Sequence, residues 1–184
     1  FYDKDGRSSK KTLMKTPLNG ARLSSGFGNR KHPILGFTKM HKGVDFAAPI
    51  GSPIFAAGDG IIEYSGWNGA YGKYIRIKHN GTFKTAYAHL SKIYKKRGTR
   101  IKQGDIIGTL GSTGRSTGPH LHYEILVSGR QVNPLRIKLP SGKSIPKNEL
   151  ENFYKKQEVI NNKIYAMRNK IKKNEFAYLK NMNN

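Results

Sequence analysis

The sequence predicts a mainly β protein, an antiparallel sheet or sandwich followed by a C-terminal helical extension. The chain has 21 glycines among 184 residues, and they stand in short turn-like clusters. Short apolar runs separate the clusters, as is typical of antiparallel sheets with many turns. Near the C-terminus apolar residues recur at three-, four- or seven-residue spacing instead, which indicates a helix.

These patterns set the order of the elements. Residues 1–15 are polar and basic without any period, and we expect them to form an N-terminal tail. The folded domain is expected over residues 16–137. Its strand candidates, each bounded by turn residues, are Ile54–Ala57, Gly60–Ser65, Tyr74–His79, Thr82–His89, Ile106–Leu110 and His120–Val127.

One pair of strands has a predictable register. Asn80-Gly81 lies between two candidates and favours a two-residue hairpin turn. In that register Tyr74 faces Tyr87, and Gly72 faces His89. A glycine in that place would leave room beside the imidazole of His89.

The sheet pattern stops after Leu135. Residues 138–146 contain two prolines and a Ser-Gly pair, so we expect a linker. Asn148-Glu-Leu-Glu151 resembles a capping box, and residues 147–184 are expected to be helical. An apolar stripe along this helix is expected to pack against the domain or against a partner.

Composition limits the function classes. The 34 Lys and Arg outnumber the 11 Asp and Glu, which gives a formal charge of +23 and predicts attraction to polyanions, unless the charge only solvates the surface. The chain has no cysteine, so disulfides, thiolate metal sites and cysteine nucleophiles are excluded. No apolar run approaches about 18 residues, the length that predicts a membrane span. The chain starts at Phe1 without a leader and is expected to be a processed or excised piece.

Three histidines and an aspartate stand in two short frames. His41 and Asp45 are four residues apart, and His120 and His122 are two apart. Gly43 makes a helix unlikely in the first frame, so a loop running into a strand is expected. In the second frame both rings project from one face of an extended strand. Imidazole and carboxylate suit borderline metals such as zinc, and three such ligands with an open fourth position form a catalytic site. The spacing alone leaves open which histidine of the second frame binds the metal.

The roles of three other residues are less clearly indicated by their sequence neighbours. His89 ends a strand candidate, where it is either a site residue or an ordinary edge histidine. His32 precedes a proline and is expected to be structural or to line a groove. Glu124 shares a strand face with His120 and His122, so it either orients one of these rings or pairs with a lysine across the sheet.

Further motifs accompany these frames between Pro17 and Leu135. In chain order the set is Ser24-Ser-Gly-Phe-Gly-Asn-Arg-Lys-His-Pro33, His41-Lys-Gly-Val-Asp45, Tyr87-Ala-His-Leu90, Gly111-Ser-Thr-Gly114, Thr117-Gly-Pro-His-Leu-His-Tyr-Glu124 and Val132-Asn-Pro-Leu135. In order and spacing it resembles the M23 (lysostaphin/LytM-type) zinc metallopeptidases, most closely the Gram-negative murein DD-endopeptidases. The resemblance implies one zinc ion per chain, bound by His41, Asp45 and His122. It also implies that His89 and His120 are the catalytic pair that does not bind metal.

The resemblance implies a function as well. An open groove in the sheet would bind peptidoglycan and cut its peptide cross-links, at D-alanyl–meso-diaminopimelate bonds or, as in other members, at glycyl–glycine bonds. We expect Tyr71, Tyr87 and Ser116 to bind substrate, and Trp67 to line the groove or pack in the core. The expected location is the cell envelope or periplasm, where the positive charge suits an anionic surface.

Other classes compete with this interpretation. Some LytM-like proteins have lost metal ligands and only activate murein amidases, but this chain keeps all five positions. Charge also suggests nucleic acid, and basic and aromatic residues alternate in Tyr74-Ile-Arg-Ile-Lys78. No recognised binding motif accompanies that stretch, so we expect no specific nucleic-acid partner. A glycosidase is disfavoured because residues 16–137 lack a suitable second free carboxylate.

Overall fold

The computed structural model describes residues 2–8, 11–31, 38–142 and 144–182. The chain divides into two compact units. One unit is Thr12–Pro140, and the other combines Phe1–Lys11 with Ser141–Asn184. The first unit therefore starts four residues before the predicted domain and ends three residues after it. Leu13, which the sequence places in the tail, is buried in the core of this unit.

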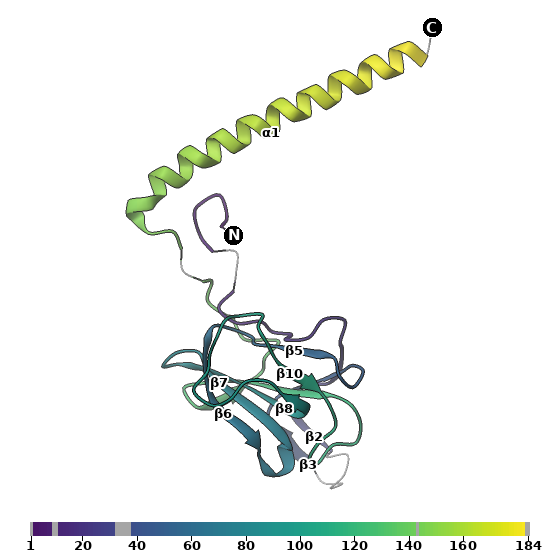
Figure 1. Ribbon diagram of the computed structural model, residues 1–184, viewed down its shortest axis with the longest axis vertical. Coiled ribbons are helices and arrows are strands. Elements are labelled where there is room, and N and C mark those ends of the chain that lie inside the picture. Colours follow the sequence, from purple (N-terminus) through teal and green to yellow (C-terminus); the bar gives the residue numbers. More distant parts are fainter. Residues whose placement is uncertain (1, 9–10, 32–37, 143, 183–184) are drawn as a thin grey trace. The chain divides into compact units, whose positions relative to one another are not determined.

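Antiparallel strands build Thr12–Pro140 (Figure 1). Among the described residues, ten strands form one sheet, in which β1, β4, β11, β8, β7, β6 and β9 are neighbours in that order. In addition β10 pairs with β5 and β8, β12 pairs with β11, and β2 and β3 form a separate two-stranded sheet. The strands are β1 (Arg22–Ser25), β2 (Gly28–Lys31), β3 (Thr38–His41), β4 (Val44–Ala47), β5 (Pro53–Phe55), β6 (Gly60–Trp67), β7 (Lys73–Lys78), β8 (Phe83–Ile93), β9 (Arg100–Ile101), β10 (Ile106–Leu110), β11 (Leu121–Val127) and β12 (Arg130–Val132), with a 3₁₀ turn, η1 (Gly69–Tyr71), between β6 and β7.

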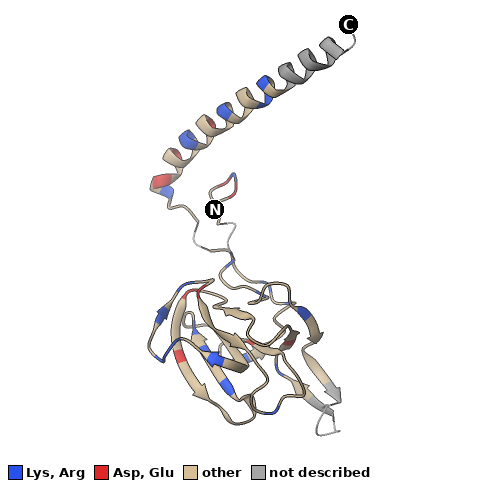
Figure 2. Ribbon diagram, turned by 45° about the vertical axis from the view of Figure 1, so that its right-hand side comes forward, with Lys and Arg blue, Asp and Glu red and all other residues tan. Residues whose placement is uncertain are grey.

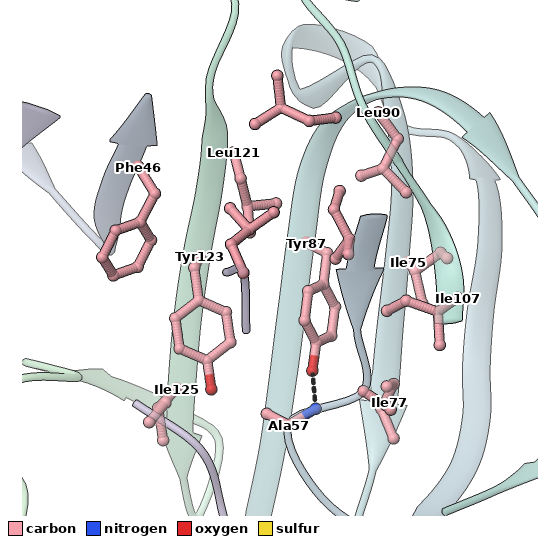
Figure 3. Packing of buried hydrophobic residues seen from close by; sticks show 14 of the residues in the cluster. Phe46, Ala57, Ile75, Ile77, Tyr87, Leu90, Ile107, Leu121, Tyr123 and Ile125 are labelled. Atoms are coloured by element: carbon pink, nitrogen blue, oxygen red, sulfur yellow. Dashed lines mark hydrogen bonds between the residues drawn. The ribbon is translucent and has the colours of Figure 1, made fainter. Parts of the chain in front are cut away.

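The core lies on one face of the large sheet, where alternate residues of β7, β8 and β11 point inward (Figure 3). Ile75 and Ile77 of β7 are fully buried there. Tyr87 of β8 and Tyr123 of β11 lie beside them with ring centroids 5.5 Å apart. Burying side chains of this size stabilises the fold by about 1.5–3 kcal/mol each.

The predicted fold class is confirmed, and all six strand candidates correspond to strands, with bounds that shift by up to four residues. The predicted hairpin register is wrong by one residue. The Asn80 side chain accepts hydrogen bonds from the backbone N–H groups of Thr82 and Phe83, which closes a longer loop than the two-residue turn. Tyr87 therefore pairs with Ile75 rather than with Tyr74. Because a one-residue slip exchanges the faces of a strand, Tyr87 points into the core.

The same register removes Gly72 from its predicted place opposite His89. Lys73 pairs with Leu90, and an irregularity separates this pair from Ile75–Tyr87. His89 lies at this bulge with φ = 62°, a left-handed conformation that is uncommon for a residue with a side chain.

The second unit contains the helix α1 (Lys147–Met182), as the helical pattern predicts. Glu149 lies in its first turn, where a negative charge is favourable next to the helix N-terminus. Within the same unit the ring of Phe153 packs edge-on against Tyr2. What the apolar stripe of α1 packs against stays a prediction. None of the described helices has the length and apolar character needed to cross a membrane.

Candidate metal centre and its pocket

Three strands bring the predicted metal ligands together. His41 ends β3, Asp45 is the second residue of β4, and His122 is the second residue of β11. Asp45 and His122 are direct cross-strand partners. The tight turn between β3 and β4 needs glycine, because a Cβ on Gly43 would lie 2.4 Å from the carbonyl oxygen of Tyr123. Strand pairing thus holds Asp45 and His122 side by side, although they are far apart in the sequence.

The three ligand atoms form a nearly equilateral triangle. Nε2 of His41 lies 3.0 Å from Oδ1 of Asp45 and 3.0 Å from Nδ1 of His122, and the third side is 2.9 Å. All three side chains are at most 10% exposed. Ligands in a tetrahedral zinc site, with bonds of about 2.0–2.1 Å, lie about 3.3 Å apart. The triangle therefore fits a metal ion with only small adjustments.

Hydrogen bonds on the far side of each ring turn lone pairs toward the triangle. Nδ1–H of His41 donates to the carbonyl oxygen of Gly26 at 2.6 Å. Nε2–H of His122 donates to Oε1 of Glu124 at 3.0 Å. Because a neutral imidazole has only one N–H, the other nitrogen of each ring is a bare acceptor that faces Asp45. Three acceptors at this distance repel each other unless a cation lies between them.

The charges around His122 also indicate that a cation is needed between the three ligand atoms. Burial by itself would lower the pKa of His122, but hydrogen bonds to Asp45 and Glu124 outweigh it and raise the pKa to about 9. Burial would raise the pKa of Asp45, yet its bonds to His122 and His41 hold it well below the usual range. Glu124 is also kept ionised, since the bond from His122 lowers its pKa despite burial. The site therefore demands positive charge, which a metal ion or a proton supplies.

His89 and His120 complete a group of four rings. Their ring centroids are 4.7 Å apart, and Nε2 of His120 lies 3.9 Å from Oδ1 of Asp45. Both rings donate Nδ1–H to a backbone carbonyl, His89 to Thr113 and His120 to Gly118, each at 2.8 Å. Burial, together with the nearby histidines, lowers the pKa of His89 to about 4. The ring is therefore neutral at neutral pH, and the lone pair of its Nε2 carries no proton.

Thr113 makes three hydrogen bonds around His89, one of them to the His89 ring. Its carbonyl accepts the His89 bond, its hydroxyl donates to the carbonyl of Leu90 at 2.8 Å, and the same hydroxyl accepts the N–H of Lys73 at 3.0 Å. Gly72 makes this close approach possible, since a Cβ there would lie 2.4 Å from the carbonyl carbon of Thr113. This network fixes the unusual backbone of His89, as is common at functional sites.

A pocket of about 550 Å³ opens over these groups. Tyr71 and Ser116, two of the predicted substrate-binding residues, line it. The hydroxyl of Tyr71 donates to Oε1 of Glu124 at 2.9 Å, and Oγ of Ser116 lies 3.2 Å from Nδ1 of His120. Two cationic side chains, Lys42 and Arg115, also line the pocket and were not predicted.

The prediction that Tyr87 lines the groove is wrong. Its side chain is fully buried in the core, and its hydroxyl accepts the backbone N–H of Ala57 at 2.8 Å (Figure 3). The reason is the register of β7 and β8 described above. Trp67 neither packs in the core nor lines the pocket, because it is 60% exposed at the end of β6.

His79 is separate from this group. The ring of His79 bonds to the carbonyl of Asp59 and the hydroxyl of Thr85, which is a structural role. His32 lies outside the described residues. Glu124 takes the first of the two roles that its sequence position allowed, because it bonds to a ring nitrogen of His122. Sequence reasoning missed Gly26, Thr113 and Gly118, which contact the histidine rings through backbone carbonyls that residue type does not reveal.

Tyr74 bears on the nucleic-acid alternative. It is only 4% exposed, and its ring packs against Tyr64 and Tyr71. Arg76 in the same strand is bonded to Glu63. This stretch is therefore not an open platform on which bases stack.

The chain is similar to known peptidases in sequence. The model of the family described as "Peptidase family M23" matches residues 39–134. The peptidoglycan DD-endopeptidase ShyC of Vibrio cholerae is 48% identical over 154 residues, which are 83% of this chain and 36% of ShyC. The DD-carboxypeptidase/endopeptidase Mpg of Neisseria meningitidis is 46% identical over 141 residues, 76% of this chain and 33% of Mpg. The chain thus spans about a third of the length of these relatives.

Solved structures give the same result for the fold. A zinc containing peptidase from Vibrio cholerae is 40% identical, with a TM-score of 0.67 over 76% of this chain and 46% of that one. The catalytic domain of lysostaphin from Staphylococcus simulans is 38% identical, with a TM-score of 0.59 over 64% of this chain and 91% of that domain.

Proposed function

This chain belongs to peptidase family M23, and from that membership we propose that it is a zinc-dependent endopeptidase that hydrolyses peptide cross-links of peptidoglycan. The observation that carries the proposal is the triangle of His41, Asp45 and His122 beside the pair of His89 and His120. The first three residues would hold one zinc ion, and the other two would move protons.

The ligand set suits zinc. Two imidazole nitrogens and one carboxylate oxygen are donors that zinc prefers, and three protein ligands leave a position for water or substrate. When bound, zinc acts as a Lewis acid that lowers the pKa of water from about 16 toward 7. A zinc peptidase is also among the similar structures.

The histidine pair would carry the proton through the reaction. Hydrolysis adds one water across the peptide C–N bond, so the water loses a proton and the leaving nitrogen gains one. We propose that Nε2 of His89 or His120 accepts the proton as the water oxygen bonds to the carbonyl carbon. The protonated ring then donates it to the nitrogen as the C–N bond breaks. Both Nε2 atoms are available because each Nδ1–H is bonded to a backbone carbonyl.

The names of the relatives support the substrate. ShyC and Mpg are both named for cleavage at D,D bonds, and ShyC is named for peptidoglycan. We therefore propose the D-alanyl–meso-diaminopimelate cross-link as the bond that is cut, in the cell envelope or periplasm. Basic residues are spread along strands, loops and α1, and few acidic residues accompany them (Figure 2). Such a charge would hold the enzyme on anionic envelope surfaces in a salt-dependent manner.

Two alanine variants test the division of roles. His122→Ala should lose both zinc and hydrolysis of purified sacculi. His120→Ala should retain zinc and lose hydrolysis by about a hundredfold or more. Zinc content is measured by atomic absorption, and the cleaved bond is identified from new amino termini by mass spectrometry. Full zinc occupancy in His122→Ala would refute the ligand assignment.

The same assays address the alternative role as an activator of a murein amidase. An activator would release no new amino termini by itself and would stimulate an added amidase equally well in the wild type and in His120→Ala.

A further inference from the structure

The charges along the pocket are unequal. Lys42 and Arg115 both line it and are exposed. The one acidic side chain along the pocket, within the described residues, is Asp45, which is bonded to His41 and His122 and is a candidate metal ligand. In the described part of the chain, no ion pair or side-chain hydrogen bond involves Arg115 or Lys42. The pocket therefore offers two uncompensated cations, and a bound metal ion would add to this charge.

Arg115 has a fixed backbone. Its N–H donates to the carbonyl of Ala70 at 2.8 Å. The preceding Gly114 packs so closely on η1 that a Cβ there would lie 2.4 Å from the nitrogen of Gly72. Further along the same loop, Ser112 donates to Ser116 at 3.0 Å. The guanidinium is thus carried on a rigid loop rather than on a free surface segment.

That loop also holds one of the proton-transferring histidines. His120 bonds to the carbonyl of Gly118 and lies within 3.2 Å of Ser116, both of which follow Arg115 on the loop. Lys42, in contrast, belongs to the turn between the metal-ligand candidates His41 and Asp45. Arg115 therefore lies on the loop whose carbonyls at Thr113 and Gly118 hold the two histidines that we propose return the proton to the leaving nitrogen.

From this arrangement we infer that Arg115 recognises a free carboxylate on the carbon atom that bears the leaving nitrogen of the substrate. The inference rests on the proposed function. A planar guanidinium binds a carboxylate through two parallel hydrogen bonds, which an amide or a hydrogen atom in that place cannot replace. At a D-alanyl–meso-diaminopimelate bond the carbon next to the scissile nitrogen bears such a carboxylate. In a glycyl–glycine bond that is followed by further peptide it does not. Arg115 would thus select between the two specificities of the family.

A matched pair of substrates tests this inference. Both are dimers of tetrapeptide stems joined by a D-alanyl–meso-diaminopimelate bond, and they differ in one group. The first has the free carboxylate beside the scissile nitrogen, and the second has a primary amide there. The wild type should cleave the carboxylate substrate with a kcat/KM about ten- to a hundredfold higher, as expected for a hydrogen-bonded charge pair. Arg115→Gln should remove this preference, and Arg115→Lys should restore part of it.

Arg100→Gln is the control, because Arg100 is an exposed cation on β9 outside the pocket. It should keep the wild-type preference. Zinc content and thermal unfolding of each variant show whether it is folded. If Arg115→Gln does not fold, the ratio of the two substrates in the wild type and in Arg115→Lys decides.

Either of two results would overturn the inference: the wild type cleaves both substrates equally, or Arg115→Gln retains the preference. In the second case, loss of the preference in Lys42→Gln would assign the recognition to Lys42 instead. Failure of the proposed function looks different, because the zinc-loaded wild type would then cleave neither substrate.

Discussion

Replacing Glu124 with glutamine tests whether the metal site depends on the hydrogen bond behind His122. Glu124 is 2% exposed, and one of its oxygens accepts both Nε2–H of His122 at 3.0 Å and the hydroxyl of Tyr71 at 2.9 Å. Its other oxygen accepts an N–H of Gln131 at 3.3 Å. All three partners are donors, so a carboxylate satisfies them and an amide does not.

The expected loss can be estimated from this geometry. In Glu124→Gln the amide oxygen can face His122, but its NH₂ group then faces the donor on Gln131. A hydrogen bond to an ionised group contributes about 1.5–3 kcal/mol and a neutral one about 0.5–1.5 kcal/mol. The difference, about 1–1.5 kcal/mol, corresponds to roughly a tenfold loss of metal affinity. This is the lower end of the ten- to hundredfold range that is common for such supporting groups.

Competition with a chromophoric zinc chelator measures the affinity. Glu63→Gln is the matched control, since Glu63 is a carboxylate of β6 that bonds to Arg76 and Lys84 and makes no contact with the histidines. We expect Glu63→Gln to bind zinc within about twofold of the wild type, the scatter usual for a surface change. An unchanged affinity in Glu124→Gln would refute the argument that this carboxylate orients His122.

Three further predictions follow from single contacts. In the metal-free protein His122 keeps its proton up to a pKa of about 9, above the ordinary 6.5, so the stability it contributes is present below pH 6.5 and is lost as the pH rises through 9. Zinc must displace this proton, so affinity measured between pH 7 and 8.5 should fall about tenfold per unit of decreasing pH, and a flat profile would contradict this. Tyr87→Phe should leave the N–H of Ala57 unpaired and lower the free energy of unfolding by about 1–3 kcal/mol, with kcat/KM unchanged. A loss of kcat/KM without a loss of stability would indicate instead that Tyr87 contacts the substrate. Gly72→Ala should displace Thr113 and lower kcat with zinc content unchanged. The new Cβ would lie 2.4 Å from the carbonyl carbon of Thr113, and the backbone of residue 72 has φ = 63°. A wild-type kcat in this variant would contradict the role of this packing.

The sequence misses the first three strands, β1, β2 and β3, as well as the short strands β9 and β12. Strands such as β10 and β11 carry apolar residues on the core face, so their pattern is visible in the chain. β1, β2 and β3 read RLSS, GNRK and TKMH, without apolar alternation. Several of these residues line the pocket, including Ser24, Ser25 and Met40. Strands that border a polar site lack the apolar face from which strands are recognised.

The hairpin of β7 and β8 shows a different limit on what the sequence can predict. The residues of Asn80-Gly81 favour a two-residue turn, but the side chain of Asn80 instead accepts two backbone N–H groups and lengthens the loop. That local choice moves the pairs from Ile75–Tyr87 to Lys78–Lys84 by one residue, and the bulge beside His89 moves Lys73–Leu90 by one more. The slip explains the buried position of Tyr87, and the slip and the bulge together explain why Gly72 does not lie opposite His89.

His120 and His122 show what spacing can and cannot determine. Their two-residue spacing places both rings in the pocket, as predicted, but does not distinguish their roles. The difference lies in the neighbours. His120 donates its N–H to a neutral carbonyl, whereas His122 lies between the carboxylates of Asp45 and Glu124. Two anionic neighbours favour a cation at Nδ1 of His122. Glu124 shares a strand face with both histidines, so the sequence left open which ring it contacts, and the structure shows that it bonds to His122.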